Sequence, residues 1–250
     1  MLLAAFCGFF AANQSGNPWF GLIAGIAAGL LMTVFSGWFA QFLKVDQVVV
    51  GTATTLFSLG IMSTLYRLQF GESGKLLSTP DLPKWGPFDL IAWALVPTAI
   101  FVHLVLFRTR WGLRVRACGE LPDAVSSQKL SVPKLRIQAM IVAGILAGVA
   151  GAYLSLGIAH SFAENMVGGR GFVAIAMVTF GRWRPMWAVG AALFIGALES
   201  LQFTLQSKGL GIPYQLLLAL PYIAALIVLA ALNKGSLAPK ALGEPYEQSV

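Results

Sequence analysis

The sequence predicts an all-α fold, a polytopic bundle of membrane helices with about seven or eight membrane segments, one of them short or re-entrant. Of its 250 residues, 57% are hydrophobic and 11% are charged, against about 25% charged in an average soluble domain. Four uncharged windows reach the length of about 20 residues that crosses a bilayer core. They are 18–43, 48–66, 137–159 and 212–233.

Eight apolar segments are expected, in chain order, at 1–12, 18–43, 47–70, 88–107, 135–156, 171–181, 186–205 and 213–232. The first has no positive n-region and no good cleavage site, so we do not interpret it as a signal peptide. Its length indicates a partial helix, or a chain whose true start lies upstream. Segment 171–181 is too short to span alone, and we expect a half-helix sheltered by protein. If it re-enters, every later orientation reverses.

The block 108–136 holds seven of the seventeen Lys and Arg residues. Because positive charge near span ends resists export, we expect this block to face the cytoplasm. Alternation then places twelve basic residues inside and five outside. The expected organisation is one transmembrane domain, 1–232, followed by a short, polar and poorly ordered cytoplasmic tail, 233–250.

Several classes of function find no support in the sequence. It contains no GxxxxGK[ST] phosphate loop, and Cys7 and Cys118 form no CxxC pair, so we expect no nucleotide site, no metal and no cofactor. The net charge of +7 follows the loops and indicates no face for nucleic acid. An intramembrane enzyme would need a catalytic pair at one depth, for which His103 with Glu199 is the candidate.

Small residues recur at the spacing of packed helices. Gly21, Gly25 and Gly29 lie four residues apart, and Gly144 and Gly148 repeat this spacing. Such stripes let two helix backbones approach closely inside a membrane. We therefore expect these glycines to be helix-packing contacts, with a hinge or a pore-facing groove as the alternative.

Polar side chains within the apolar segments suggest where a solute passes. Glu199 lies inside segment 186–205, where an ionisable group is expected to face the bundle interior or a wet cavity. Gln202 follows on the same helical face, and Thr52 and Thr55 form a second polar stripe. We expect these residues to line a translocation path, with hydrogen bonding between helices as the alternative.

The basic block has internal structure of its own. Pro122 is suited to open a helix, and Asp123 suits its positive N-terminal end. We expect a short helix that runs to about Lys129, after which Pro133 breaks the chain before the next span. Such a helix on the cytoplasmic face is either a handle for another protein or a solvated loop that sets only the topology.

The motifs at 112–136 and 164–185 resemble the permease subunits of ABC importers. The resemblance is to the simple sugar and nucleoside branch of the branched-chain amino acid permease superfamily, and it runs from Met1 to about Leu232. It implies that the 108–136 block is the loop that couples the permease to an ATPase. The family segment A-x-G-E-x-P-x-A, with the preceding arginine, falls on Arg116, Ala117, Gly119, Glu120, Pro122, Asp123 and Ala124.

The resemblance also implies the surroundings of the chain. We expect a multi-pass protein of the bacterial cytoplasmic membrane that works with a cytoplasmic ATPase, a second permease subunit of a different chain and an extracytoplasmic solute-binding lipoprotein. The chain itself would carry no ATPase site. Two positions depart from the family pattern, Val125 for an alanine and Lys129 for a glycine, so the helix end is expected to differ. Related permeases begin with another span, and we expect the given sequence to start beyond it.

The function expected from this resemblance is import of a small polar solute, a nucleoside or a simple sugar, by alternating access. Three alternatives remain at this point. The first is a permease of the branched-chain amino acid type. The second is a secondary carrier or channel that works without an ATPase, and the third is the intramembrane enzyme that His103 and Glu199 would require.

Overall fold

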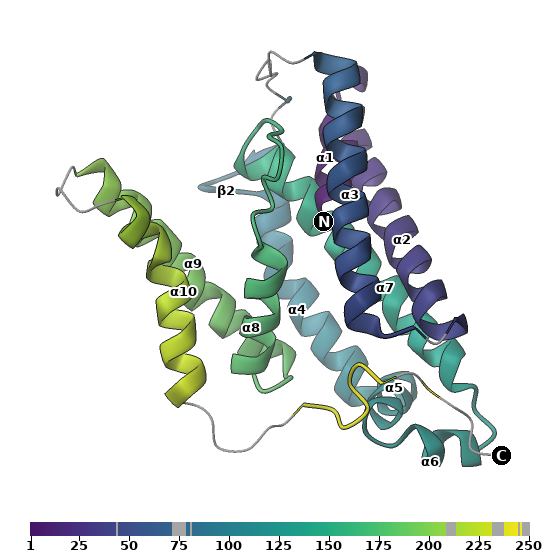
Figure 1. Ribbon diagram of the computed structural model, residues 1–250. Coiled ribbons are helices and arrows are strands. Elements are labelled where there is room, and N and C mark those ends of the chain that lie inside the picture. Colours follow the sequence, from purple (N-terminus) through teal and green to yellow (C-terminus); the bar gives the residue numbers. More distant parts are fainter. Residues whose placement is uncertain are drawn as a thin grey trace. The chain divides into compact units, whose positions relative to one another are not determined.

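The computed structural model describes residues 1–43, 45–71, 79–80, 82–208, 214–231, 238–244 and 246. Within them, helices account for almost all regular structure (Figure 1). The chain divides into two compact units. Unit 1 comprises Met1–Leu95, Arg110–Gly168 and Lys240–Val250, and unit 2 comprises Val96–Thr109 and Gly169–Pro239. Helix α4 contributes its beginning to unit 1 and the remainder to unit 2.

Each of the eight predicted apolar segments contains a helix, and their order is confirmed. The helices are α1 (Leu2–Ser15), α2 (Pro18–Phe42), α3 (Gln47–Phe70), α4 (Leu90–Arg108), α7 (Val132–Tyr153), α8 (Arg170–Phe180), α9 (Pro185–Ser207) and α10 (Tyr214–Ala231). Prolines lie in the first turn of α2, α7 and α9, where the missing N–H costs nothing. Pro133 therefore belongs to the first turn of α7 and does not separate it from the preceding block.

Five helices in the described residues are long and apolar enough to cross a membrane: α2, α3, α4, α9, and α7 with its continuation to Ile158. Helices α1 and α8 are apolar but shorter. At 1.5 Å per residue, the 11 residues of α8 extend about 17 Å, little more than half of a bilayer core of about 30 Å. The chain is thus a polytopic helical membrane protein, whereas the number of seven or eight segments stays a prediction.

Side-chain caps begin two of the spans. The Asn17 side chain accepts a hydrogen bond from the backbone N–H of Trp19 at 3.0 Å, at the start of α2. At the start of α3, one Asp46 carboxylate oxygen accepts from Val48 at 2.7 Å. These bonds satisfy backbone donors that lack partners within the helix.

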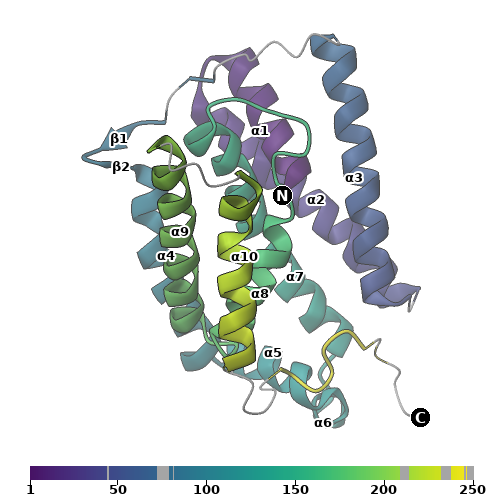
Figure 2. The ribbon, with the colours of Figure 1, turned by 60° about the vertical axis from the view of Figure 1, so that its left-hand side comes forward.

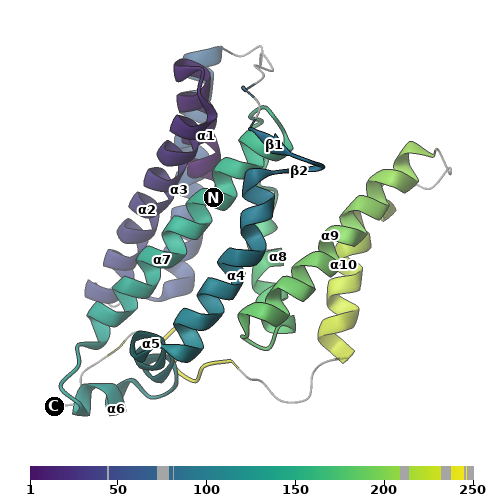
Figure 3. The same cartoon turned by 180° about the vertical axis from the view of Figure 1, so that it is seen from behind.

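Helices α1, α2 and α7 form the centre of unit 1 (Figure 3). Their contact depends on residues without side chains: a Cβ added at Gly29 would lie 2.6 Å from the Gly148 Cα atom, and one added at Gly148 would lie 2.7 Å from the Ile26 Cα atom. No real carbon approaches that closely. We call this contact between α2 and α7 the glycine seam. It lets the two backbones touch along their length.

A second cluster joins α1, α3 and the segment after α7. The Phe162 ring is 2% exposed and lies 5.3 Å from the Phe6 ring and 5.4 Å from the Tyr66 ring, centre to centre. Helix α7 continues into η1 (Leu154–Ile158), a π-helical turn. The Ser155 hydroxyl, fully buried there, donates to the Ala5 carbonyl at 2.9 Å. The cluster anchors the irregular segment 159–168.

In unit 2, helices α8, α9 and α10 contact one another (Figure 2). A local irregularity follows α8, where Arg182 and Trp183 both adopt left-handed backbone angles before Pro185 opens α9. These two left-handed residues reverse the direction of the chain within four residues. A turn so tight brings α8 and α9 together as neighbours.

Three elements were not predicted. Helix α5 (Arg110–Glu120) occupies the first part of the basic block, where the sequence indicated a loop. A hairpin of β1 (Lys84–Trp85) and β2 (Phe88–Asp89) precedes α4, and the π-turn η1 extends α7. Arginine and leucine favour helices, but α5 is charged and therefore does not appear in the sequence as an apolar segment.

Candidate functional site

The basic block folds as two helices, α5 and α6 (Pro122–Ser127), joined at Leu121. Helix α6 begins at Pro122, as predicted, with Asp123 in its first turn. We call α5 and α6 together the coupling block. Of the seven residues predicted for coupling, α5 carries Arg116, Ala117, Gly119 and Glu120, and α6 carries Pro122, Asp123 and Ala124.

The inner face of the coupling block packs against the start of α7. Cys118 and Val125 are 3% and 5% exposed, and they form one cluster with Val132 and Leu135 of α7. Val125, a departure from the family pattern, thus supplies apolar contact in this cluster. These contacts join α6 directly to the start of α7.

The outer face of the coupling block is open. Leu121 is 60% exposed at the joint between the two helices, and Glu120, Asp123 and Ala124 are exposed beside it. An exposed leucine between two acidic side chains offers a partner both apolar area and charge. Arg116 is also exposed, whereas Ala117, Gly119 and Pro122 are half-buried.

The end of α6 shows what the second departure does. Lys129 adopts a left-handed backbone with φ of 59°, the conformation that glycine usually supplies at this point. Its N–H donates to the Ser126 carbonyl at 2.8 Å. The helix therefore ends as it would with glycine, at the steric cost of a Cβ in that region.

The residues predicted for a translocation path form two separate stripes. Thr52 and Thr55 of α3 are exposed in unit 1, and their hydroxyls donate to carbonyls of their own helix at 2.9 and 2.8 Å. Glu199 is half-buried and Gln202 is 4% exposed on α9, in unit 2. Each threonine hydroxyl uses its hydrogen in a bond within its own helix. Its lone pairs therefore remain available to accept a hydrogen bond.

Another residue on α9 belongs with this stripe. Gln206 follows Gln202 by one turn, and its buried Nε2 atom has no acceptor among the described residues. A buried amide without a partner costs free energy unless water or a ligand supplies one. The four-residue spacing was the sequence signal that places Gln206 on the face of Gln202.

His103 gives little support to enzymatic chemistry. Its ring stacks on the Phe107 ring, with 4.9 Å between the centres, and its Nδ1 atom lacks a partner among the described residues. Within those residues there is also no group of three or more side chains that suits a metal ion.

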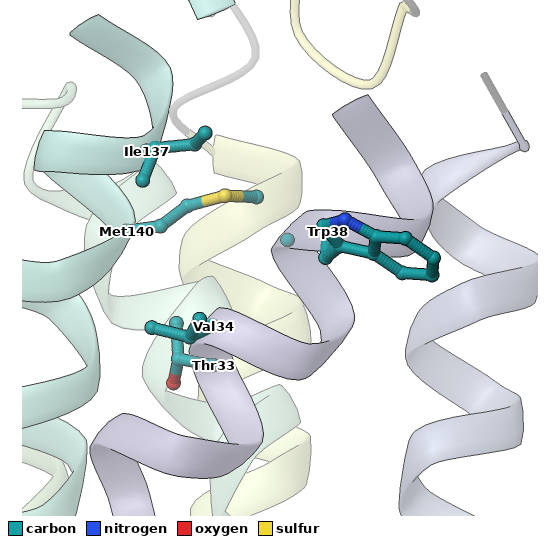
Figure 4. A pocket seen from close by; sticks show the side chains of 6 residues that line it. Thr33, Val34, Trp38, Ile137 and Met140 are labelled. Carbon is teal, nitrogen blue, oxygen red and sulfur yellow. The ribbon is translucent and has the colours of Figure 1, made fainter. Parts of the chain in front are cut away.

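An apolar pocket of about 200 Å³ lies between α2 and α7, beside the glycine seam (Figure 4). Its lining comes from Thr33, Val34, Gly37, Trp38, Ile137 and Met140. The Thr33 hydroxyl donates to the Gly29 carbonyl at 2.8 Å, so the pocket offers few free polar groups. Such a lining suits hydrocarbon better than a polar solute.

At the opposite end of unit 1, an ion pair ties α3 to segment 159–168. Arg67 Nε lies 3.1 Å from Glu164 Oε1, and both side chains are exposed. The hydrogen bond from Arg67 lowers the pKa of Glu164 below its ordinary value. The ion pair thus joins α3 to the same segment, 159–168, that Phe162 anchors.

Comparison with known proteins places these features in a family. The chain is 32% identical over 92% of its length to the guanosine ABC transporter permease protein NupQ of Bacillus subtilis, of which it covers 77%. It is 29% identical over 94% of its length to the nucleoside ABC transporter permease protein NupC of Lactococcus lactis, of which it covers 80%. It is 32% identical over 85% of its length to a protein of Haloferax volcanii named "Putative glucose ABC transporter permease protein TsgC13". The chain covers 69% of that protein.

No solved structure matches the chain. The family model described as branched-chain amino acid transport system, permease component, matches residues 1–232. This range ends where the resemblance in the sequence ended, and the predicted relationship is confirmed. The chain belongs to this family of ABC transporter permeases.

Proposed function

We propose that this chain is the membrane-spanning subunit of an ATP-driven importer for a nucleoside, with a simple sugar as the second candidate solute. Two of the relatives carry nucleoside or guanosine in their names, against one with glucose. The observation that carries the proposal is the coupling block, an exposed two-helix handle seated on α7. A carrier driven by an ion gradient would have no use for such a handle.

The proposed partners follow from this role. A cytoplasmic ATPase binds the outer face of the coupling block and hydrolyses ATP on its own chain. A second, different permease subunit completes the path, and an extracytoplasmic lipoprotein delivers the solute. The location is the bacterial cytoplasmic membrane, where 1–232 forms one permease domain with seven or eight membrane segments and 233–250 a cytoplasmic tail.

Force enters at α6 and travels along one continuous set of contacts. Val125 presses on Val132 and Leu135 at the start of α7. The glycine seam then moves α2 together with α7, because the two backbones touch and leave no slack. Unit 1 moves as a body in response to the ATPase, and the polar stripes at Thr52, Thr55, Glu199 and Gln202 receive the solute in alternate orientations.

Transport in proteoliposomes tests the proposal. The complete importer is expected to take up radiolabelled guanosine only with ATP, and unlabelled nucleosides are expected to compete while glucose does not. Competition by glucose alone would move the assignment to sugars. Competition by leucine alone would favour the branched-chain amino acid alternative. Uptake by this chain alone, driven by an ion gradient, would refute the importer.

A second experiment tests the docking role. Ala124 is exposed on α6, and replacing it with arginine adds bulk and charge to the proposed docking face while the buried face stays intact. Ala124→Arg is expected to abolish ATPase binding in purified complexes. Gln128→Arg, at an exposed position after α6, is the matched control and is expected to bind normally. Normal binding by both variants would contradict the docking role.

A further inference from the structure

The C-terminal end of the chain returns to the coupling block. We call Lys240–Glu244 with Tyr246 the strap; its described part runs beside α5 (Figure 1, yellow). The sequence indicated a poorly ordered tail here. Instead, the described residues of the strap make contacts with α5, α6 and α7.

Two hydrogen bonds, one from the strap's backbone and one from the Arg136 side chain, fix the strap at two points. The Ala241 N–H donates to the Gly119 carbonyl at 2.9 Å. Gly119 lies in the last turn of α5, where carbonyls have no partner within the helix, so the strap caps that end. At the second point, Arg136 Nη1 of α7 donates to the Glu244 carbonyl at 2.8 Å.

Tyr246 supplies the third contact. Its ring packs against the cluster that joins the coupling block to α7, formed by Cys118, Val125, Val132 and Leu135. The ring thus covers the same side chains through which α6 presses on α7. Its hydroxyl is buried without a hydrogen-bond partner among the described residues, so only the ring contributes to the contact.

We propose that the strap positions the coupling block on α7, with Tyr246 and Arg136 as the positioning residues. This inference rests on the proposed function, since it assigns the strap to the efficiency of coupling. Helices α5 and α6 together bury only Gly112, Cys118 and Val125 among their described residues. Two short helices held by so few buried residues would tilt under load. The strap adds its own contacts to this cluster and to the end of α5, so that ATPase movement shifts α7 instead of tilting α6.

The test compares Tyr246→Ala with Tyr246→Phe in the complete importer. Tyr246→Ala removes the ring, whereas Tyr246→Phe removes only the unpaired hydroxyl. We expect the solute transported per ATP hydrolysed to fall about fivefold in Tyr246→Ala, the ratio that corresponds to losing a half-buried aromatic contact. Tyr246→Phe is expected to match the wild type, and ATPase affinity is expected to stay unchanged in both. Equal transport ratios in Tyr246→Ala and wild type, or equal losses in both variants, would overturn the inference.

A truncation gives a readout that does not depend on transport. A chain that ends at Pro239 lacks the strap but keeps every helix found in the described residues. Hydrogen exchange in the purified complex is expected to speed up in 110–130 and to stay unchanged in α2. Unchanged exchange in 110–130 would refute the positioning role. Failure of the wild-type chain to bind any ATPase would instead count against the proposed function, so the two failures are distinguishable.

Discussion

Helix α7 carries two contacts of opposite character. Along its middle, the glycine seam brings its backbone against that of α2 with no side chain between them. At its beginning, the coupling block is held by a small cluster around Cys118 and Val125, with an exposed outer face. The first contact has no room for an added atom, and the second depends on a few buried side chains. One helix thus joins a rigid pair of backbones to a two-helix block that needs further support.

A substitution in the glycine seam is expected to cause the largest loss of stability. Gly29→Ala places a Cβ 2.6 Å from the Gly148 Cα atom, and backbone rather than a flexible side chain must then move. We expect a loss of about 3 kcal/mol or more, at the upper end of overpacking costs. Thermal unfolding in detergent measures it. Gly60→Ala is the matched control in α3, where an added Cβ meets nothing within 4 Å, and it is expected to be neutral or stabilising by about 0.5 kcal/mol. Equal melting temperatures would show that the seam has slack.

Removing one side chain of the handle is expected to have a smaller and more local effect. Val125→Ala removes two buried methyl groups from the cluster with Val132 and Leu135. A cost of about 1–2 kcal/mol is expected from lost burial. Hydrogen exchange should rise in α5 and α6 and stay unchanged in the middle of α7. A uniform rise across unit 1 would mean that the seam and the handle unfold together.

The end of α6 is expected to become more stable after one substitution. Lys129→Gly relieves the left-handed strain at φ of 59°, which costs about 1–2 kcal/mol for a residue with a Cβ, partly offset by the greater freedom of glycine in the unfolded chain. We expect slower exchange in α6 and unchanged or tighter ATPase binding. Lys134→Gly, in the first turn of α7, is the control and is expected to destabilise. A destabilised Lys129→Gly variant would contradict the interpretation of this turn.

The ion pair between Arg67 and Glu164 is expected to give the smallest effect, because both groups are exposed. Since the folded-state pKa of Glu164 is lowered from 4.5, its contribution is present above that value and is lost as the pH falls through the lowered pKa. Melting temperature should therefore decline slightly more in the wild type than in Glu164→Gln over that range. Identical slopes would show that the pair adds nothing to stability.

Most of the fold was predictable because a bilayer imposes strong constraints. Long uncharged runs such as 18–43 satisfy their own backbone in lipid by forming helices, and α2 extends over almost that range. Helix α5 was not predictable by the same means, because its charges removed it from the search for apolar runs. Likewise, the strap has no apolar period or motif. Its place depends on the Gly119 carbonyl at the end of α5, on the Arg136 side chain and on the cluster that Tyr246 packs against.

The candidate site divides in the same way. Motif resemblance located Gly119, Pro122 and Asp123, and the structure places them at the joint and the start of two helices. No pattern in the sequence indicated that Val125 faces inward while Ala124 faces outward, because a six-residue helix is too short for a reliable period. The polar stripes on α3 and α9 could be recognised from the spacing of their residues. The hydrogen-bond partners of their side chains could not.

The sequence by itself determined that this protein crosses a membrane as helices, in which order the apolar helices follow one another, and to which family of permeases it belongs. These properties depend on local composition, spacing and motifs, which each segment of the chain carries independently of the other segments. Tertiary structure alone decided that Gly29 meets Gly148 and that Tyr246 packs against the cluster around Val125. Contacts of this kind join residues about 120 positions apart in the chain, and their energies come from close fit between surfaces that no single segment contains.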